Sequence, residues 1–241
     1  DMDAWYTPFD FNVAKNLLHG RAEKIYALCF GGNTLNKHYP PEKYARLLEM
    51  ILAEDSSATF VIIGGGKNDS ISAQILKNTA PKIYDENIID LTNKINYRQT
   101  AAVLRLCDMY IGNDTGTTQL AVCAHIPIVA VHHVAKDLPS PNILDAFFPW
   151  QTNAIFLQPE HQLGDCRKAN SPLGCIAGKP HCITQIKPEE IVSAYETMIN
   201  FIKKSGIKNL GCSQIMRHID KISELLQDYP KCYFHVDMTQ A

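Results

Sequence analysis

The sequence lacks several features that would assign it to a familiar class of protein. The 241-residue chain has no uninterrupted apolar run long enough to span a bilayer and no signal peptide at its start. Its formal charge of −2 provides no general basis for binding nucleic acid or an anionic membrane. It also has no internal repeat and no low-complexity tract. We therefore expect a cytosolic globular protein without a nucleic-acid partner.

The chain also lacks the cysteine spacing of a small disulfide framework or a structural zinc site. Three of its eight cysteines lie in apolar segments and are typical of core thiols: Cys29, Cys107 and Cys123. A second group, with His181 beside it, has no Cys-x2-Cys pair: Cys166, Cys175 and Cys182. A loop stabilised by packing or by one disulfide is favoured over zinc there. Since no cluster of carboxylates is spaced for Mg²⁺ either, we expect no metal ion.

Short apolar strands alternate with amphipathic helices along most of the chain. The expected strands cover residues 24–30, 59–63, 88–91, 108–111, 126–131 and 154–157. The expected helices lie near residues 12–18, 41–51, 69–78, 98–107, 188–203 and 213–227, with a small-residue helix after Gly116. This alternation predicts an α/β fold with a doubly wound parallel sheet.

The same pattern divides the chain into three parts. Residues 1–23 are mixed in composition and are interpreted as a lead-in or interdomain linker segment. Residues 24–205 contain the alternating strands and helices and form the predicted Rossmann-like domain. A breaker at Ser205-Gly206 precedes residues 206–241, which we interpret as a C-terminal helical extension.

The most informative segment is the polar turn Gly112-Asn113-Asp114-Thr115-Gly116, between a buried strand and a small-residue helix. Open α/β sheets bind ligands at such strand ends, and a helix N-terminus offers free N–H groups to phosphate. Asp114 would repel phosphate, so we interpret it as the N-cap of the helix. The following amides, with the hydroxyls of Thr115, Thr117 and Thr118, are then expected to face an anion. A capped helix start without any ligand is the alternative.

A second polar loop follows the first strand and contains Gly31, Gly32, Asn33 and Thr34. Such residues let the backbone approach a phosphate closely. Lys37 comes directly after this loop, where a cation would offset the charge that grows on a leaving nucleoside diphosphate. A solvated surface lysine is the alternative interpretation.

Two further segments carry weaker signals. The three glycines at residues 64–66 need only form a tight turn, and the chain has no Gly-x-Gly-x-x-Gly loop there, which counts against an NAD-dependent oxidoreductase. His132 and His133 follow the strand that ends at Val131. Adjacent side chains of an extended segment face opposite ways, so at most one of them can point into a cleft. Neither has a paired carboxylate nearby in sequence, and both stay unassigned.

Taken in order, these motifs resemble the family-9 glycosyltransferases, the heptosyltransferase-like enzymes of lipopolysaccharide assembly. The matching pieces, spread over roughly residues 24–203, are Lys37-His38-Tyr39-Pro40, residues 61–66, 89–92, 101–104, 112–116, 127–130 and 186–192. The resemblance implies the C-terminal half of a GT-B architecture, which holds the nucleotide-sugar donor. The first domain of that architecture, which binds the acceptor and supplies the proposed general base, has no counterpart in these residues.

The resemblance also implies a reaction. It implies inverting, metal-independent transfer of a sugar, expected to be heptose, from a nucleoside-diphosphate sugar, expected to be ADP-linked. The implied acceptor is a lipopolysaccharide-type glycan or glycolipid, so the protein is expected in the cytoplasm, where it could lie at the inner membrane face. No cofactor is expected besides this donor substrate.

The resemblance finally assigns site residues. It places Lys37 near the donor phosphates, Asp114, Thr115 and Gly116 in the donor site, and Asn68 or Asp69 near the ribose. Helix N-capping explains Asp69 equally well. The family commonly has histidine where this chain has Gln119, which can donate a hydrogen bond to phosphate but carries no charge. A non-catalytic nucleotide-binding or protein-interaction module on the same fold is therefore the alternative function.

Overall fold

A computed structural model of the chain describes residues 4–20, 24–32, 34, 37–137, 153–164 and 179–206. Within these ranges, six strands form one sheet: β1 (Ile25–Cys29), β2 (Thr59–Ile62), β3 (Ile88–Asp90), β4 (Met109–Asn113), β5 (Ile128–Val131) and β6 (Ala154–Leu157). Every neighbouring pair is parallel, and the strand order is β3-β2-β1-β4-β5-β6. This is the order of the Rossmann fold. The predicted doubly wound parallel sheet is confirmed.

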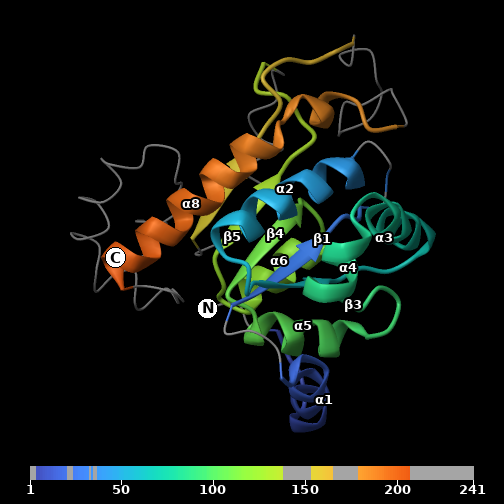
Figure 1. Cartoon of the computed structure of the whole chain (residues 1–241), viewed down its shortest axis with the longest axis vertical. Coiled ribbons are helices and arrows are strands. Elements are labelled where there is room, and N and C mark those ends of the chain that lie inside the picture. The colour runs from blue at the N-terminus through green and yellow to red at the C-terminus, as the bar shows by residue number, and fades with distance from the viewer. Residues whose placement is uncertain are drawn as a thin grey trace.

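Helices cover both faces of the sheet. Those described are α1 (Pro8–Leu18), α2 (Pro41–Glu54), α3 (Lys67–Thr79), α4 (Pro81–Asn87), α5 (Tyr97–Leu106), α6 (Gly116–Cys123), the short 3-10 helix η3 (Cys182–Gln185) and α8 (Pro188–Ser205). Helices α2 and α8 lie on one side of the sheet, whereas α5 and α1 lie on the other (Figure 1). Each face has its own apolar core because side chains alternate along each strand.

Two helices differ from the sequence expectation. Helix α1 begins earlier than predicted because Thr7 caps it: the Thr7 hydroxyl accepts the amide of Asp10 at 3.2 Å, and the Asp10 carboxylate accepts the Thr7 amide at 2.9 Å. This helix packs against α5 and buries Ala14, so part of the expected lead-in segment joins the core. Helix α4 was not predicted, because it buries no residue and therefore has no apolar periodicity.

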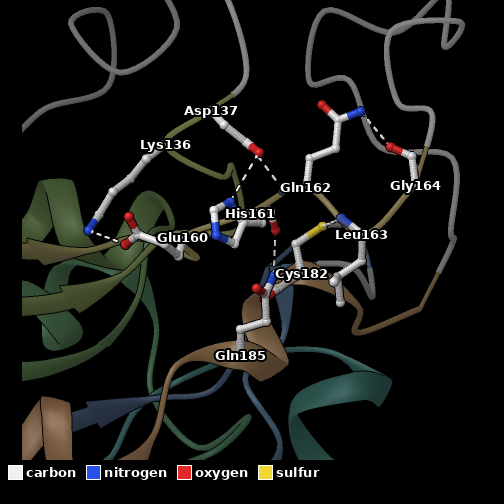
Figure 2. Close-up of polar contacts among 9 residues, drawn as sticks. All are labelled: Lys136, Asp137, Glu160, His161, Gln162, Leu163, Gly164, Cys182 and Gln185. Atoms are coloured by element: carbon white, nitrogen blue, oxygen red, sulfur yellow. Dashed lines mark hydrogen bonds and ion pairs between the residues drawn. The ribbon is translucent and has the colours of Figure 1, made fainter.

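The loop after β6 is tied to the loop after β5 and to η3 (Figure 2). Asp137 accepts the amide of Gln162 at 2.9 Å, and its carboxylate lies 3.4 Å from His161 Nδ1. The amide of Leu163 donates to Cys182 Sγ at 3.3 Å. These contacts join the described part of the loop after β6 to the end of the loop after β5 and to η3.

Several expectations lie outside the described residues. They concern Cys166, Cys175, Asn33 and the helix expected at residues 213–227, and the division into three parts therefore stays a prediction. In the part of the chain that the structure does describe, no helix is both long and apolar enough to span a bilayer.

Gly112 allows β1 and β4 to approach each other closely in the centre of the sheet. A Cβ atom at this position would lie 2.7 Å from the carbonyl oxygen of Cys29 and 3.0 Å from its amide nitrogen. Both atoms belong to the backbone of a paired strand and cannot move aside without disturbing the ladder. A glycine is therefore required here by packing.

We predict that Gly112→Ala lowers the free energy of unfolding by about 1–3 kcal/mol, the usual range for overpacking a rigid interior. Urea unfolding followed by circular dichroism measures this change. Gly116→Ala is the matched control, because nothing lies within 4 Å of a Cβ atom there, and the free energy of unfolding should not fall. Equal stability of Gly112→Ala and the wild type would contradict the packing explanation.

Candidate phosphate-binding cleft

A cleft of about 700 Å³ opens at the carboxyl ends of β1, β2 and β4. Its wall includes most of the residues predicted from the sequence: Gly32, Lys37, Asp69, Asp114, Thr115, Gly116, Thr117 and Gln119. Thr34 is exposed and is not part of the wall, and Asn33 is outside the described residues. The parallel sheet brings the segments together, because all of its strands end at one edge.

Helix α6 is capped by Thr115 and not by Asp114. The Thr115 hydroxyl accepts the amide of Thr117 at 3.1 Å, and the Thr118 hydroxyl accepts the amide of Thr115 at 3.0 Å. The prediction that Asp114 is the N-cap is therefore wrong by one residue. Both residue types are good caps, and the extended backbone of Thr115 decides between them.

Thr118 does not face the cleft. Its side chain is fully buried, and its hydroxyl lies 2.9 Å from the carbonyl oxygen of Asn113 and 3.1 Å from the Tyr110 hydroxyl. The prediction that this hydroxyl contacts an anion is wrong, because the capping box turns it into the protein. Gly116, by contrast, is exposed at the first position of the helix, and among the described residues nothing accepts its amide. That amide is available to a ligand.

The Asn113 side chain holds the two predicted phosphate loops together. Its Nδ2 donates to the carbonyl of Phe30, with a second, longer contact of 3.4 Å to the carbonyl of Gly31. Its Oδ1 accepts the Tyr44 hydroxyl at 3.0 Å. Asn113 is completely buried, so these bonds are shielded from water. The loop after β1 is thus fixed against the turn after β4.

The Asp114 carboxylate has a histidine partner that the sequence interpretation left unassigned. His132 Nε2 lies 3.2 Å from Asp114 Oδ2, and both side chains are buried. Asn113 of β4 is paired with Val131 of β5, so the next residues of the two strands are Asp114 and His132. The pairing of Asp114 with His132 could have been predicted if the register of β4 and β5 had been known.

Lys37 reaches the cleft from the loop after β1. Among the described residues its ammonium has no carboxylate within ion-pair distance, and it lines the same cleft as Gly116. Its positive charge also helps to lower the pKa of His133. The pKa of His133 falls to about 3, first because of burial and then because of His132 and Lys37. His133 is therefore neutral near pH 7.

Asp69 is a buried carboxylate between two glycine loops. It stands in the first turn of α3, where its Oδ2 accepts the amide of Gly65 at 2.7 Å, and the N-cap itself is Gly66. A Cβ atom on Gly31 or Gly64 would come closer than 3.0 Å to this carboxylate. The Asp69 Oδ1 atom has no hydrogen-bond partner among the described residues. This oxygen is itself buried, so it does not face the open cleft.

The sequence interpretation missed one part of the cleft wall. The segment between β3 and α5 contributes Asn93, Ile95 and Asn96, and Tyr97, the first residue of α5, is 83% exposed. The signal was present, because the third parallel strand ends at the same edge as the others. The cleft wall thus combines Lys37 and polar groups with an aromatic ring and an isoleucine.

The pKa of Asp69 yields a prediction about pH. Burial raises it, although the Gly65 amide and His38 act in the opposite direction. A carboxyl whose pKa is raised on folding stabilises the folded chain at low pH, and that contribution is lost as the pH rises through the folded pKa. Asp69→Asn cannot ionise but keeps an acceptor for the Gly65 amide.

We therefore predict that Asp69→Asn becomes more stable, relative to the wild type, as the pH is raised from about 4 to 7. Urea unfolding of both proteins across this range measures the difference. A relative stability that stays constant or declines over the range would contradict a buried carboxylate with a raised pKa.

The cleft can now be compared with known proteins. The model of glycosyltransferase family 9 (heptosyltransferase) matches residues 8–177. The lipooligosaccharide heptosyltransferase 2 of Campylobacter jejuni subsp. jejuni serotype O:2 is 25% identical over 206 residues, which are 83% of this chain and 58% of the relative.

Two solved structures share the fold. The family 9 glycosyl transferase of Veillonella parvula DSM 2008 matches with a TM-score of 0.63 at 21% identity, over 82% of this chain and 53% of that one. The E. coli ADP-heptose LPS heptosyltransferase II matches with a TM-score of 0.62 at 15% identity, over 83% and 54% of the two chains.

The chain thus spans between half and three fifths of the length of these relatives. The strand order and the two structures confirm the expected fold class, the Rossmann-like half of a GT-B glycosyltransferase. The family model covers well over half of the chain, from α1 to beyond β6. The chain belongs to glycosyltransferase family 9 (heptosyltransferase).

Proposed function

We propose that this chain is the C-terminal, donor-binding half of a glycosyltransferase that uses a nucleoside-diphosphate sugar. The observation that carries the proposal is that one cleft contains both the Lys37 ammonium and the exposed Gly116 amide at the start of α6. A cation and a helix N-terminus in one cleft can bind a diphosphate without help from a metal.

The proposed reaction breaks the bond between the sugar and the diphosphate. An acceptor hydroxyl attacks the anomeric carbon from the opposite face, which inverts its configuration, and the nucleoside diphosphate leaves with the bonding electrons. Lys37 and the amides at the start of α6 would stabilise the charge on the leaving group. The acceptor site and the base that takes the hydroxyl proton would lie in the part of the relatives' length that this chain does not span.

The nucleoside would contact another part of the cleft wall. Tyr97 and Ile95 offer apolar surface to a nucleobase, and Asp69, which lines the same cleft, is the proposed neighbour of the ribose. One relative is a lipooligosaccharide heptosyltransferase, and one structural neighbour is an ADP-heptose enzyme. We therefore propose ADP-heptose as the donor and a lipopolysaccharide-type glycan as the acceptor.

A non-catalytic nucleotide-binding or protein-interaction module is the second candidate. It is favoured by Gln119, an uncharged residue that lines the cleft where the family commonly has histidine. A module of this kind could still bind a nucleotide but would not hydrolyse or transfer the sugar. Turnover of the donor by the protein therefore separates the two candidates.

We predict that ADP binds this chain more tightly than UDP, GDP or CDP, as measured by isothermal titration calorimetry. Lys37→Ala and Thr115→Val should each raise the dissociation constant for ADP about ten-fold, equivalent to about 1.4 kcal/mol. Lys37 loses a charge-assisted hydrogen bond to phosphate, and Thr115 loses the cap that orients the α6 amides.

Lys82→Ala is the control for Lys37, because Lys82 is exposed on α4 and is not part of the cleft wall. Its affinity for ADP should equal that of the wild type. Absence of binding to any of the four nucleotides would refute the proposed donor site, and full affinity in both variants would place the diphosphate elsewhere.

The exposed ring of Tyr97 in the cleft wall yields a separate prediction. Tyr97→Ala should raise the dissociation constants for ADP and for adenosine by the same factor, about ten-fold. Stacking of a base on an aromatic ring contributes about 1–3 kcal/mol to binding. Phe9→Ala is the control, since Phe9 is similarly exposed but lies on α1, away from the cleft. Calorimetry with both ligands measures the effect. If Tyr97→Ala binds adenosine as tightly as the wild type does, the base lies elsewhere.

A further inference from the structure

The proposed diphosphate site contains a negative charge that needs an explanation. Asp114 lines the cleft two residues before Gly116, whose amide is exposed to a ligand. A carboxylate free to turn toward a bound diphosphate would repel it. Only 6% of Asp114 is exposed, and the repulsion between two charges is stronger where water is excluded. The position of this side chain therefore controls whether the cleft favours an anion.

The His132 ring is fixed in one tautomer by the backbone. Its Nδ1 accepts the amide of Val134 at 3.1 Å, so in the neutral ring the hydrogen is on Nε2. That nitrogen lies 3.2 Å from Asp114 Oδ2 and can donate to it. His132 is only 2% exposed, so the ring cannot turn away without breaking the packing of the loop after β5.

Among the described residues, no other charged group nearby is placed to hold the Asp114 carboxylate. Within the described ranges, no Lys or Arg side chain lies within ion-pair distance of Asp114. His133 packs against His132 with the ring centroids 4.8 Å apart, but the low pKa of His133 keeps it neutral. Lys37 is the cation that lines the same cleft, and it is needed for the diphosphate itself.

We propose that His132 is a positioning residue that holds the Asp114 carboxylate toward β5 and away from the diphosphate. This inference rests on the proposed function and adds a residue to the same site. In this arrangement the carboxylate shapes the turn after β4 through its hydrogen bond, while its charge is directed away from the Gly116 amide.

A double-mutant cycle tests the proposal with the whole 241-residue chain. The proteins are the wild type, His132→Leu, Asp114→Asn and the double variant, and the ligands are ADP and adenosine. His132→Leu should raise the dissociation constant for ADP about ten-fold, because the freed carboxylate repels the diphosphate. Adenosine carries no phosphate, so its dissociation constant should not change.

The double variant is the decisive member of the cycle. Removing the charge of Asp114 in the His132→Leu background should restore the affinity for ADP to within about three-fold of the wild type. If His132 were merely structural, the double variant would bind ADP as weakly as His132→Leu or more weakly, and adenosine binding would be lost in parallel. Either result would overturn the proposal.

A conservative variant and an NMR spectrum distinguish loss of the proposed contact from loss of folding. His132→Gln keeps an N–H donor at a similar distance from Asp114 and should bind ADP like the wild type. In ¹⁵N-labelled wild-type protein, the imidazole resonances of His132 should show a protonated Nε2 and an unprotonated Nδ1; the reverse pattern would refute the proposal.

Failure of the wild type to bind any nucleoside diphosphate would reject the proposed function and this inference together. If the wild type binds ADP normally and the losses of ADP affinity in His132→Leu and Asp114→Asn simply add in the double variant, only the inference about His132 is rejected.

Discussion

The buried side chain of Asn113 determines the relative position of the two halves of the cleft. It joins the carbonyl groups at the end of β1 to the end of β4 and is itself held by the Tyr44 hydroxyl. The loop that carries Lys37 begins at one of these ends, and the turn that starts α6 begins at the other. Because Asn113 is fully buried, each of its polar atoms needs a partner inside the protein, and this requirement fixes both loops at once.

The cleft combines this rigid frame with an uneven distribution of charge. Lys37 and the Gly116 amide face one region, whereas the carboxylates of Asp69 and Asp114 are buried in its walls. Each of these carboxylates is bonded to a group of the protein: Asp69 to the Gly65 amide and Asp114 to His132. Both acidic side chains are thus held by contacts within the protein. The proposed donor is an anion, so the proposal requires that these carboxylates are not turned toward it.

Much of this arrangement could be predicted from the sequence. The strands were found because each is a short apolar run followed by glycine or polar residues, and the cleft was found because parallel strands end at one edge. The cap of α6 was misplaced by one residue, since composition does not distinguish Asp114 from Thr115. The partner of Asp114 was missed because His132 is distant in sequence, and only the register of β4 and β5 brings the two together. Helix α4 gave no signal because none of its residues is buried.

A crystal structure of this chain with bound ADP would test the central claim most directly. We expect the diphosphate at the start of α6, within hydrogen-bonding distance of the Gly116 amide and of Lys37 Nζ. The Asp114 carboxylate should still face His132. A diphosphate bound at another surface, with the corner between β1 and β4 closed by its own side chains, would contradict the account.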